Sequence, residues 1–209
     1  VVDGQVVNAR QFGAVGDGVI DDTGAIQAAL DYLTNSTSGR APARYVEGGG
    51  TVYLPAGEYL VSAPIKVTHN ESLIGAGLNA STIKATSNID VIQIQYTYAT
   101  VAEYWISNIR IKDLAINGGG SAEAGITNRT STGSNPITYS KFQNVEIVGC
   151  KVGVHLFGGW NNHFQDGDVR SLDIASTAEE GMFGWILETV TSGNTYGPSG
   201  HTVTAQGGA

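Results

Sequence analysis

Two aspartates near the end of the chain, Asp166 and Asp168, have a spacing that suits acid–base chemistry. Residues at i and i+2 of an extended segment point to the same side. Cleavage of a glycosidic bond needs two carboxyl groups facing each other across that bond, about 5 to 10 Å apart. We therefore predict that Asp166 and Asp168 act as acid and base, provided that residues 165–169 are extended. The competing interpretation is a pair of solvated turn carboxylates.

Two histidines precede this pair, His155 and His163, eight positions apart. Imidazole exchanges protons near neutral pH, so either ring is suited to proton transfer if it approaches the other or a carboxylate. We predict a catalytic role for His155 and a substrate-binding role for His163. The alternative is that both are outward-facing surface histidines.

Aromatic and amide side chains in the same region suggest sugar binding. Trp160, beside Asn161, offers a flat apolar face on which a sugar ring can stack, and Tyr139 offers another with a polar tip. We predict that Trp160, Asn161, His163 and Tyr139 bind substrate. Burial in the core or in a subunit interface is the alternative for the aromatic residues.

The acidic loop at residues 16–22 has oxygen ligands that a hard cation such as Ca²⁺ prefers, but it lacks the spacing and the final glutamate of a calcium loop. Turn formation and helix capping are the stronger interpretation. We assign no metal ligands and no cofactor, and Ca²⁺ stays a secondary hypothesis.

The composition argues against several classes of partner. The formal net charge is −8, from 19 acidic and 11 basic residues, which opposes binding to nucleic acid or to an anionic membrane surface. No apolar run is long enough to span a bilayer, so we expect no membrane insertion. The single cysteine, Cys150, excludes an intramolecular disulfide, and its apolar surroundings predict a buried thiol.

One helix is expected, over residues 22–34. Ile26, Ala29, Leu30 and Leu33 fall on one face at i, i+3, i+4 and i+7, and Asp22 precedes them as N-cap. Before it, the pattern predicts a strand near residues 6–12 and then a stiff loop.

Short β-branched segments that end in polar breaks fill most of the remaining chain. They are residues 65–67, 73–74, 82–85, 91–95, 109–111, 114–116, 142–147, 152–157, 163–164 and 169–174, after two strands around the turn at residues 55–57. Each has one apolar face and needs a shared interior. Hairpin turn signals are scarce, so stacked coils fit better than a sandwich. The helix at residues 22–34 would then cover the open apolar end of the first coil.

These segments predict one all-β domain over residues 1–209. Residues 1–50 hold the first strand, the loop and the capping helix, residues 51–190 the coils, and residues 191–209 an irregular C-terminal segment. Nothing at that end resembles a second cap, so we expect either a truncated β-helix or one closed by partner subunits.

Two blocks, residues 8–30 and residues 48–59, resemble the opening of the pectate-lyase-like superfamily, which includes phage tailspike depolymerases and alginate epimerases. The resemblance implies a right-handed parallel β-helix with three sheets, a polysaccharide partner, an extracellular or virion-associated location and, as in many phage members, a homotrimer. The epimerases and related lyases carry an Asp-Pro-His-Glu cluster on a middle coil. Residues 154–158 correspond loosely to it here, and only His155 can be carried over.

The sequence therefore leads to two hypotheses. The first is a polysaccharide depolymerase, either a glycoside hydrolase or a lyase, of the tailspike or secreted type. The second is a non-catalytic β-helix fragment of a tailspike or adhesin that binds a glycan or receptor without cutting it.

Overall fold

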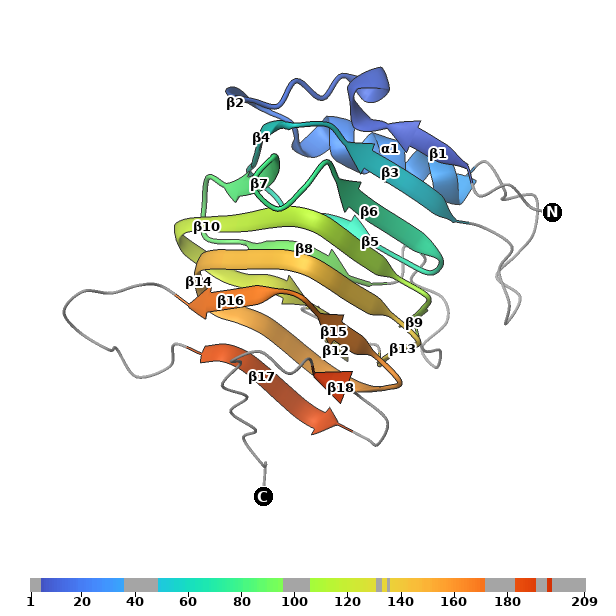
Figure 1. Ribbon diagram of the computed structural model, residues 1–209, viewed down its shortest axis with the longest axis vertical. Helices are drawn as coiled ribbons and strands as arrows, with labels where there is room; N and C mark the ends of the chain where they lie inside the picture. Colours follow the sequence, from blue (N-terminus) through green and yellow to red (C-terminus); the bar gives the residue numbers. More distant parts are fainter. Residues whose placement is uncertain are drawn as a thin grey trace.

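The chain winds into a right-handed parallel β-helix with one α-helix across its N-terminal end (Figure 1). The computed structural model describes residues 5–35, 49–95, 106–130, 133–134, 136–171, 183–190 and 195–196. The first half contains β1 (Val6–Asn8), the 3-10 helix η1 (Ala9–Phe12), β2 (Asp17–Asp21), α1 (Thr23–Asn35), β3 (Gly50–Leu54), β4 (Gly57–Val61), β5 (Ile65–Val67), β6 (Glu71–Gly75), β7 (Ser81–Ala85) and β8 (Asp90–Ile94). The second half contains β9 (Ile106–Ser107), β10 (Arg110–Thr127), β11 (Arg129–Thr130), β12 (Gly133–Ser134), β13 (Ile137–Thr138), β14 (Lys141–Trp160), β15 (His163–Gln165), β16 (Asp168–Ser171), β17 (Phe183–Val190) and β18 (Thr195–Tyr196).

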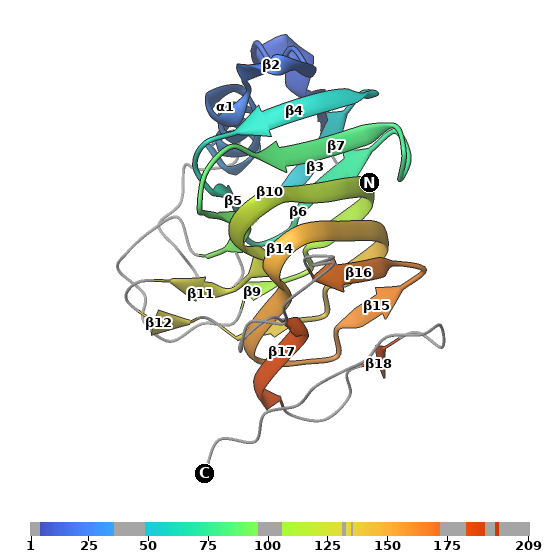
Figure 2. The same ribbon diagram turned by 90° about the vertical axis from the view of Figure 1, so that its left-hand side faces the viewer.

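Parallel pairing sorts these strands into three faces of the coil. The front sheet is β1, β3, β6, the starts of β10 and β14, β15 and β18. The side sheet is β2, β4, β7, the middles of β10 and β14, and β16, and it faces the viewer in Figure 2. The back sheet is β5, β8, the ends of β10 and β14, and β17. β10 and β14 pass through all three faces without a break, as Figure 1 shows.

The interior of the coil is a continuous apolar core. Alternate residues point inward, so Val52 and Leu54 of β3 are fully buried, while Thr51 and Tyr53, which precede each of them, face outward. Equivalent positions stack from coil to coil. Phe142 and Phe164 of neighbouring front strands lie ring on ring, with centroids 4.4 Å apart and planes at 5°. The shared interior expected from the sequence is confirmed.

Helix α1 closes the N-terminal end of this core, as predicted. Its apolar face is buried, with Ile26, Ala29 and Leu33 at 0% exposure. Its polar side chains replace a missing strand: Gln27 accepts a hydrogen bond from the backbone N–H of Lys66 on β5 at 2.8 Å and donates to the carbonyl of the same residue at 3.2 Å. The helix therefore covers the apolar end of the core and also provides hydrogen-bond partners for the backbone at the edge of β5.

The N-terminal segment differs from the prediction in three ways. The strand expected at residues 6–12 ends at Asn8, because Asn8 and Gln11 form a capping box that starts η1. The expected stiff loop contains β2, which pairs with β4. The Asp22 carboxylate bonds backward to the N–H groups of Val15 and Gly16, whereas the first helical N–H, that of Thr23, donates to Asp21.

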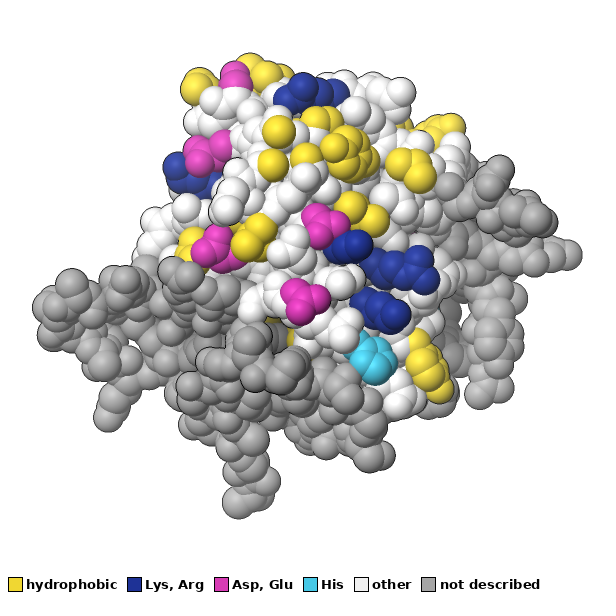
Figure 3. Space-filling model, viewed as in Figure 1, with side chains coloured by type: hydrophobic (Ala, Val, Ile, Leu, Met, Phe, Trp, Pro, Cys, Tyr) yellow, Lys and Arg dark blue, Asp and Glu magenta, His cyan; other side chains and the backbone are white. Residues whose placement is uncertain are grey.

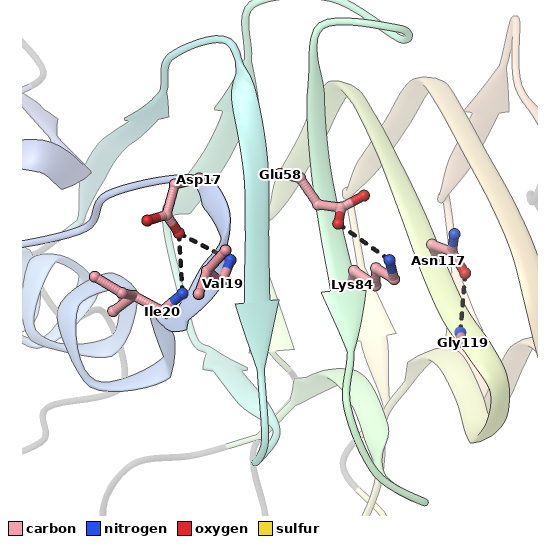
Figure 4. Close-up of polar contacts among 7 residues, drawn as sticks. All are labelled: Asp17, Val19, Ile20, Glu58, Lys84, Asn117 and Gly119. Carbon is pink, nitrogen blue, oxygen red and sulfur yellow. Dashed lines mark hydrogen bonds and ion pairs between the residues drawn. The ribbon is translucent and has the colours of Figure 1, made fainter.

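Short polar contacts hold the outer surface of the side sheet, as Figure 4 shows. Asp17 Oδ1 accepts hydrogen bonds from the N–H groups of Val19 and Ile20, both at 2.9 Å. One coil further on, Lys84 Nζ lies 3.0 Å from Glu58 Oε1. Asn117 Oδ1 accepts from Gly119 N–H in the turn between the side and back sheets. Asp17 and Asn117 thus stabilise turns, and Glu58 forms a surface ion pair with Lys84.

Two further predictions concern the single cysteine and membrane-spanning helices. Cys150 is fully buried, so the predicted buried thiol is confirmed, and this burial raises the pKa of the thiol to about 12. No helix in the described part of the chain has the length and apolar character needed to cross a bilayer.

Candidate functional site

Three basic side chains form one row across the front sheet. The register places Arg110 of β10 beside Lys141 of β14, and Lys141 beside His163 of β15. Their inward neighbours, including Ile111 and Phe142, are buried, so all three side chains point out of the coil. Parallel strands lie about 4.8 Å apart, so this basic row presents one group at each step along the helix axis.

Two members of the basic row, Arg110 and Lys141, lie outside the ion pairs of the described residues. The salt bridges among the described residues are Lys84–Glu58, Lys112–Asp113 and Lys151–Glu123, and none of them includes Arg110 or Lys141. Two unit charges about 5 Å apart repel by about 1 kcal/mol in water, which an anion bound between them would relieve. Figure 3 shows basic side chains and one histidine gathered over β10, β14 and β15.

A column of left-handed corner residues runs beside the basic row. Asn70, Asn108, Tyr139 and Asn161 all have φ between 51° and 60° and each lies one or two positions before a front strand. Asn108 donates a side-chain hydrogen bond to Asn70 at 3.1 Å. The Tyr139 side chain is 62% exposed. The structure thus brings together three of the predicted substrate-binding residues, Tyr139, Asn161 and His163, next to two cations that the prediction omitted.

Buried polar side chains hold this corner in place. Ser140 Oγ accepts the N–H of Ile109 in the preceding coil at 3.1 Å, and Asn162 Oδ1 accepts the N–H of Ser140 at 3.1 Å. Asn162 Nδ2 also donates to the carbonyl of Ile137 at 2.9 Å. Because these bonds step from coil to coil, they fix the spacing of Tyr139 and Asn161 along the axis.

The predicted acid pair has a different geometry from the one assumed. Asp166 has φ 53° and is exposed at the corner between the front and side sheets, where Gln143 Nε2 donates to it at 3.4 Å. Asp168 begins β16 and pairs with Glu146 on the side sheet. Residues 165–169 are therefore bent, because the chain turns from the front sheet to the side sheet at Asp166, which has a left-handed backbone conformation. The extended geometry was wrong, and the acid and base roles stay predictions.

The two histidines do not meet. His155 lies on the back sheet, between Thr127 and Ile186, and its ring packs against Phe157 with centroids 4.9 Å apart. His163 lies on the front sheet beside Lys141. The seven residues between them turn a corner of the coil, so the two rings do not approach each other. The catalytic role assigned to His155 stays a prediction. His155 lies on the back sheet, whereas Asp166 lies at the corner between the front and side sheets.

For two of the predicted residues, only the backbone is described. Trp160 ends β14 and pairs with Thr138, which places it at the corner just before His163. Its side chain and that of Asp168 lie outside the described part of the structure, so sugar stacking on Trp160 stays a prediction.

The carboxylates of the acidic loop have partners within the protein. Asp21 accepts from Thr23 and from the Ser62 hydroxyl, and these bonds lower its pKa. Asp22 accepts from Val15 and Gly16. Among the described residues, no group of three or more His, Cys, Asp or Glu side chains is arranged to hold a metal ion. The turn and capping functions are observed, and Ca²⁺ binding stays a hypothesis.

Comparisons with known proteins extend these observations. The sequence profile of the family described as rhamnogalacturonase A/epimerase, pectate lyase-like, matches residues 6–111. The chain is 38% identical over 123 residues to the mannuronan C5-epimerase AlgE2 of Azotobacter vinelandii, which covers 53% of this chain and 11% of that protein. It is 41% identical over 90 residues to alginate lyase 7 of the same organism, covering 40% of this chain and 9% of that protein. These relatives are polysaccharide-modifying enzymes.

A solved structure shares the fold over most of the chain. ORF18 of Geobacillus virus E2 superimposes with a TM-score of 0.68 and 22% sequence identity, over 91% of this chain and 39% of that one. This likeness supports the β-helix architecture. The chain spans about a tenth of the length of these two curated relatives, and the family profile matches the cap and the first coils.

Proposed function

Because the chain belongs to the rhamnogalacturonase A/epimerase, pectate lyase-like family, we propose that it acts on an anionic polysaccharide bound along its front sheet. The basic row carries this proposal. In a protein with a net charge of −8, Arg110 and Lys141 stand side by side on an exposed face, outside the salt bridges of the described residues. Such a pair favours a ligand with regularly spaced negative charges.

A polyuronate fits this description. Each sugar unit of such a polymer carries one carboxylate, and the basic row presents one group per coil at a step of about 4.8 Å. Guanidinium and ammonium groups pair with carboxylates through charge-assisted hydrogen bonds. The mannuronan C5-epimerase and alginate lyase relatives are named for polymers of this class, which agrees with the charge of the row.

The chemistry that best suits this arrangement is elimination. A cation paired with the uronate carboxylate stabilises the negative charge that develops there when the C5 proton leaves. We assign the acceptance of that proton to His163, one strand beyond Lys141, and the donation of a proton to the departing O4 to Tyr139 at the adjoining corner. The electron pair of the C5–H bond forms the C4–C5 double bond as the C4–O4 bond breaks. We rank hydrolysis lower, because Asp166 at the corner and Asp168 at the start of β16 do not belong to one extended strand.

Glycan binding without cleavage is the second candidate. It is favoured by the segment at residues 154–158, which has no counterpart to three of the four residues of the Asp-Pro-His-Glu cluster and lies on the back sheet. In that case the front sheet would hold a polyuronate as a receptor.

Incubation with polymannuronate tests both candidates. We expect new ultraviolet absorbance from unsaturated chain ends, together with shortening of the polymer. New reducing ends without that absorbance would contradict elimination and indicate hydrolysis. Binding with neither product would support the receptor role, and absence of binding to any polyuronate at low salt would contradict the proposal itself.

A further inference from the structure

The front sheet continues beyond the basic row toward the N-terminal cap, and its character changes there. The row next to the basic row runs from Asn8 through Tyr53, Ile74, Lys112 and Gln143 along the helix axis. Tyr53 and Ile74 sit on β3 and β6, two coils and one coil before Lys112. The cap-side half of the front sheet thus has an aromatic and an aliphatic side chain in line with a lysine.

Tyr53 and Ile74 face outward. Val52 and Leu54 flank Tyr53 and are fully buried, and Leu73 beside Ile74 is fully buried as well. Tyr53 and Ile74 themselves are partly exposed to solvent. Alternation along each strand therefore directs both side chains away from the core, on the same face as Lys112.

Their strands carry no charge at the outward positions. The partners of Arg110 and Lys112 on β6 are Ser72 and Ile74, and the next partners on β3 are Thr51 and Tyr53. A ligand that continues along the axis from the basic row would meet neutral side chains over these two coils. Figure 3 shows apolar side chains in the region above the basic cluster.

We infer that Tyr53 and Ile74 form an apolar platform that binds the ring face of the sugar units beyond the basic row. The inference rests on the proposed function, because the ligand is the same polyuronate. One face of a sugar ring presents C–H groups, which stack on an aromatic ring, while the carboxylates stay at the edge. Tyr53 lies about 10 Å from Lys112 along the axis, at about 4.8 Å per strand. The platform therefore contacts units that a trisaccharide on the basic row does not reach.

This arrangement predicts recognition by length. A trimannuronate fills the basic row, whereas a hexamannuronate also covers the apolar platform. Titration calorimetry of the wild-type protein should show tighter binding of the hexamer. Tyr53→Ala should weaken hexamer binding about tenfold, the loss expected for one aromatic stacking contact. Trimer binding should stay within about twofold, because the trimer does not touch Tyr53.

Three further variants separate this role from a structural one. Tyr53→Phe keeps the ring and should bind the hexamer as the wild type does. Ile74→Thr should weaken the hexamer alone, by less than Tyr53→Ala. Val19→Ala shortens an exposed apolar side chain of β2, on the side sheet, and should change neither affinity.

The outcomes distinguish failure of the inference from failure of the proposed function. Equal affinity of the wild type for trimer and hexamer, or equal weakening of both by Tyr53→Ala, would overturn the platform while leaving the basic row intact. No binding of either oligomer by the wild type would overturn the proposed function and the platform with it.

Discussion

Thr34, in the last turn of α1, donates its hydroxyl to the Glu71 carboxylate at the first residue of β6, at 2.5 Å. The other oxygen of Glu71 accepts the Thr68 N–H at 2.8 Å. Glu71 is 1% exposed, so a carboxyl group buried under the cap joins the helix to the first complete coil. Burial raises its pKa from 4.5 to about 7, against the opposing effect of its hydrogen bonds.

The first prediction is that the protein loses stability as pH rises from about 4.5 to about 7. Because the folded state binds the Glu71 proton more tightly than the unfolded state, its contribution is complete below pH 4.5 and declines through pH 7. At about 1.4 kcal/mol per unit of pKa, the decline is on the order of 3 kcal/mol. Urea unfolding at several pH values measures it.

The variant Glu71→Gln should lose this pH dependence, since an amide can accept from Thr68 and does not ionise. Glu58→Gln, which changes an exposed glutamate on β4, should keep it. An unchanged pH profile in Glu71→Gln would show that other groups cause the decline.

The second prediction concerns the edge of the first back strand. Gln27→Ala removes both hydrogen bonds to the backbone of Lys66 and should lower the free energy of unfolding by about 1 to 3 kcal/mol. The exposed edge of β5 should also promote aggregation, which light scattering detects. Gln165→Ala, at an exposed front-sheet position, serves as the control and should have no such effect.

The third prediction uses two glycines with opposite surroundings. A Cβ on Gly75 would lie 2.3 Å from the Asp113 carbonyl oxygen of the next coil, so Gly75→Ala should destabilise the fold by about 1 to 3 kcal/mol. A Cβ on Gly24, in the first turn of α1, meets nothing within 4 Å, so Gly24→Ala should stabilise by about 0.5 to 1 kcal/mol. Thermal unfolding of both variants tests the sign of each effect.

The fourth prediction concerns the basic row. Arg110→Gln and Lys141→Gln should each weaken polymannuronate binding by about fivefold, since an exposed ion pair contributes up to about 1 kcal/mol. Binding by the wild type should also weaken as salt increases. Lys66→Gln removes an exposed lysine from the back sheet, also outside the salt bridges of the described residues, and should leave binding unchanged. Equal weakening by Lys66→Gln would indicate a net-charge effect with no defined site.

Local patterns sufficed to predict the helix and most of the strands. The i, i+3, i+4 spacing of Ile26, Ala29 and Leu30 marked α1, and alternation marked the strands from Ile65 onward. The errors came where a side chain competes with the backbone: Asn8 and Gln11 end β1 early, and Asp22 turns back to the loop. Such contacts depend on atoms that a periodic pattern does not describe.

The basic row was missed because its members are not periodic in sequence. Along one row of the front sheet, Ser72, Arg110, Lys141 and His163 are successively 38, 31 and 22 positions apart. The turns between strands differ in length from coil to coil, so only the strand register shows that these residues are neighbours. Asp166 and Asp168 attracted attention because they are close in sequence, yet the chain turns a corner at Asp166, so the two residues do not belong to one extended strand.

The fifth prediction separates the two reaction types through His163 and Asp166. If elimination occurs on the basic row, His163→Gln should lower the rate of formation of unsaturated ends by at least about 100-fold, the usual contribution of a positioned base. Binding should weaken little, because the cations of Arg110 and Lys141 are retained. Asp166→Asn should leave the rate within a few-fold, since Asp166 lies at the far end of β15, three residues from His163. The opposite pattern, with loss of activity in Asp166→Asn and in Asp168→Asn but full activity in His163→Gln, would restore the carboxylate pair as the acid and base and would move the reaction from the basic row to the corner between the front and side sheets.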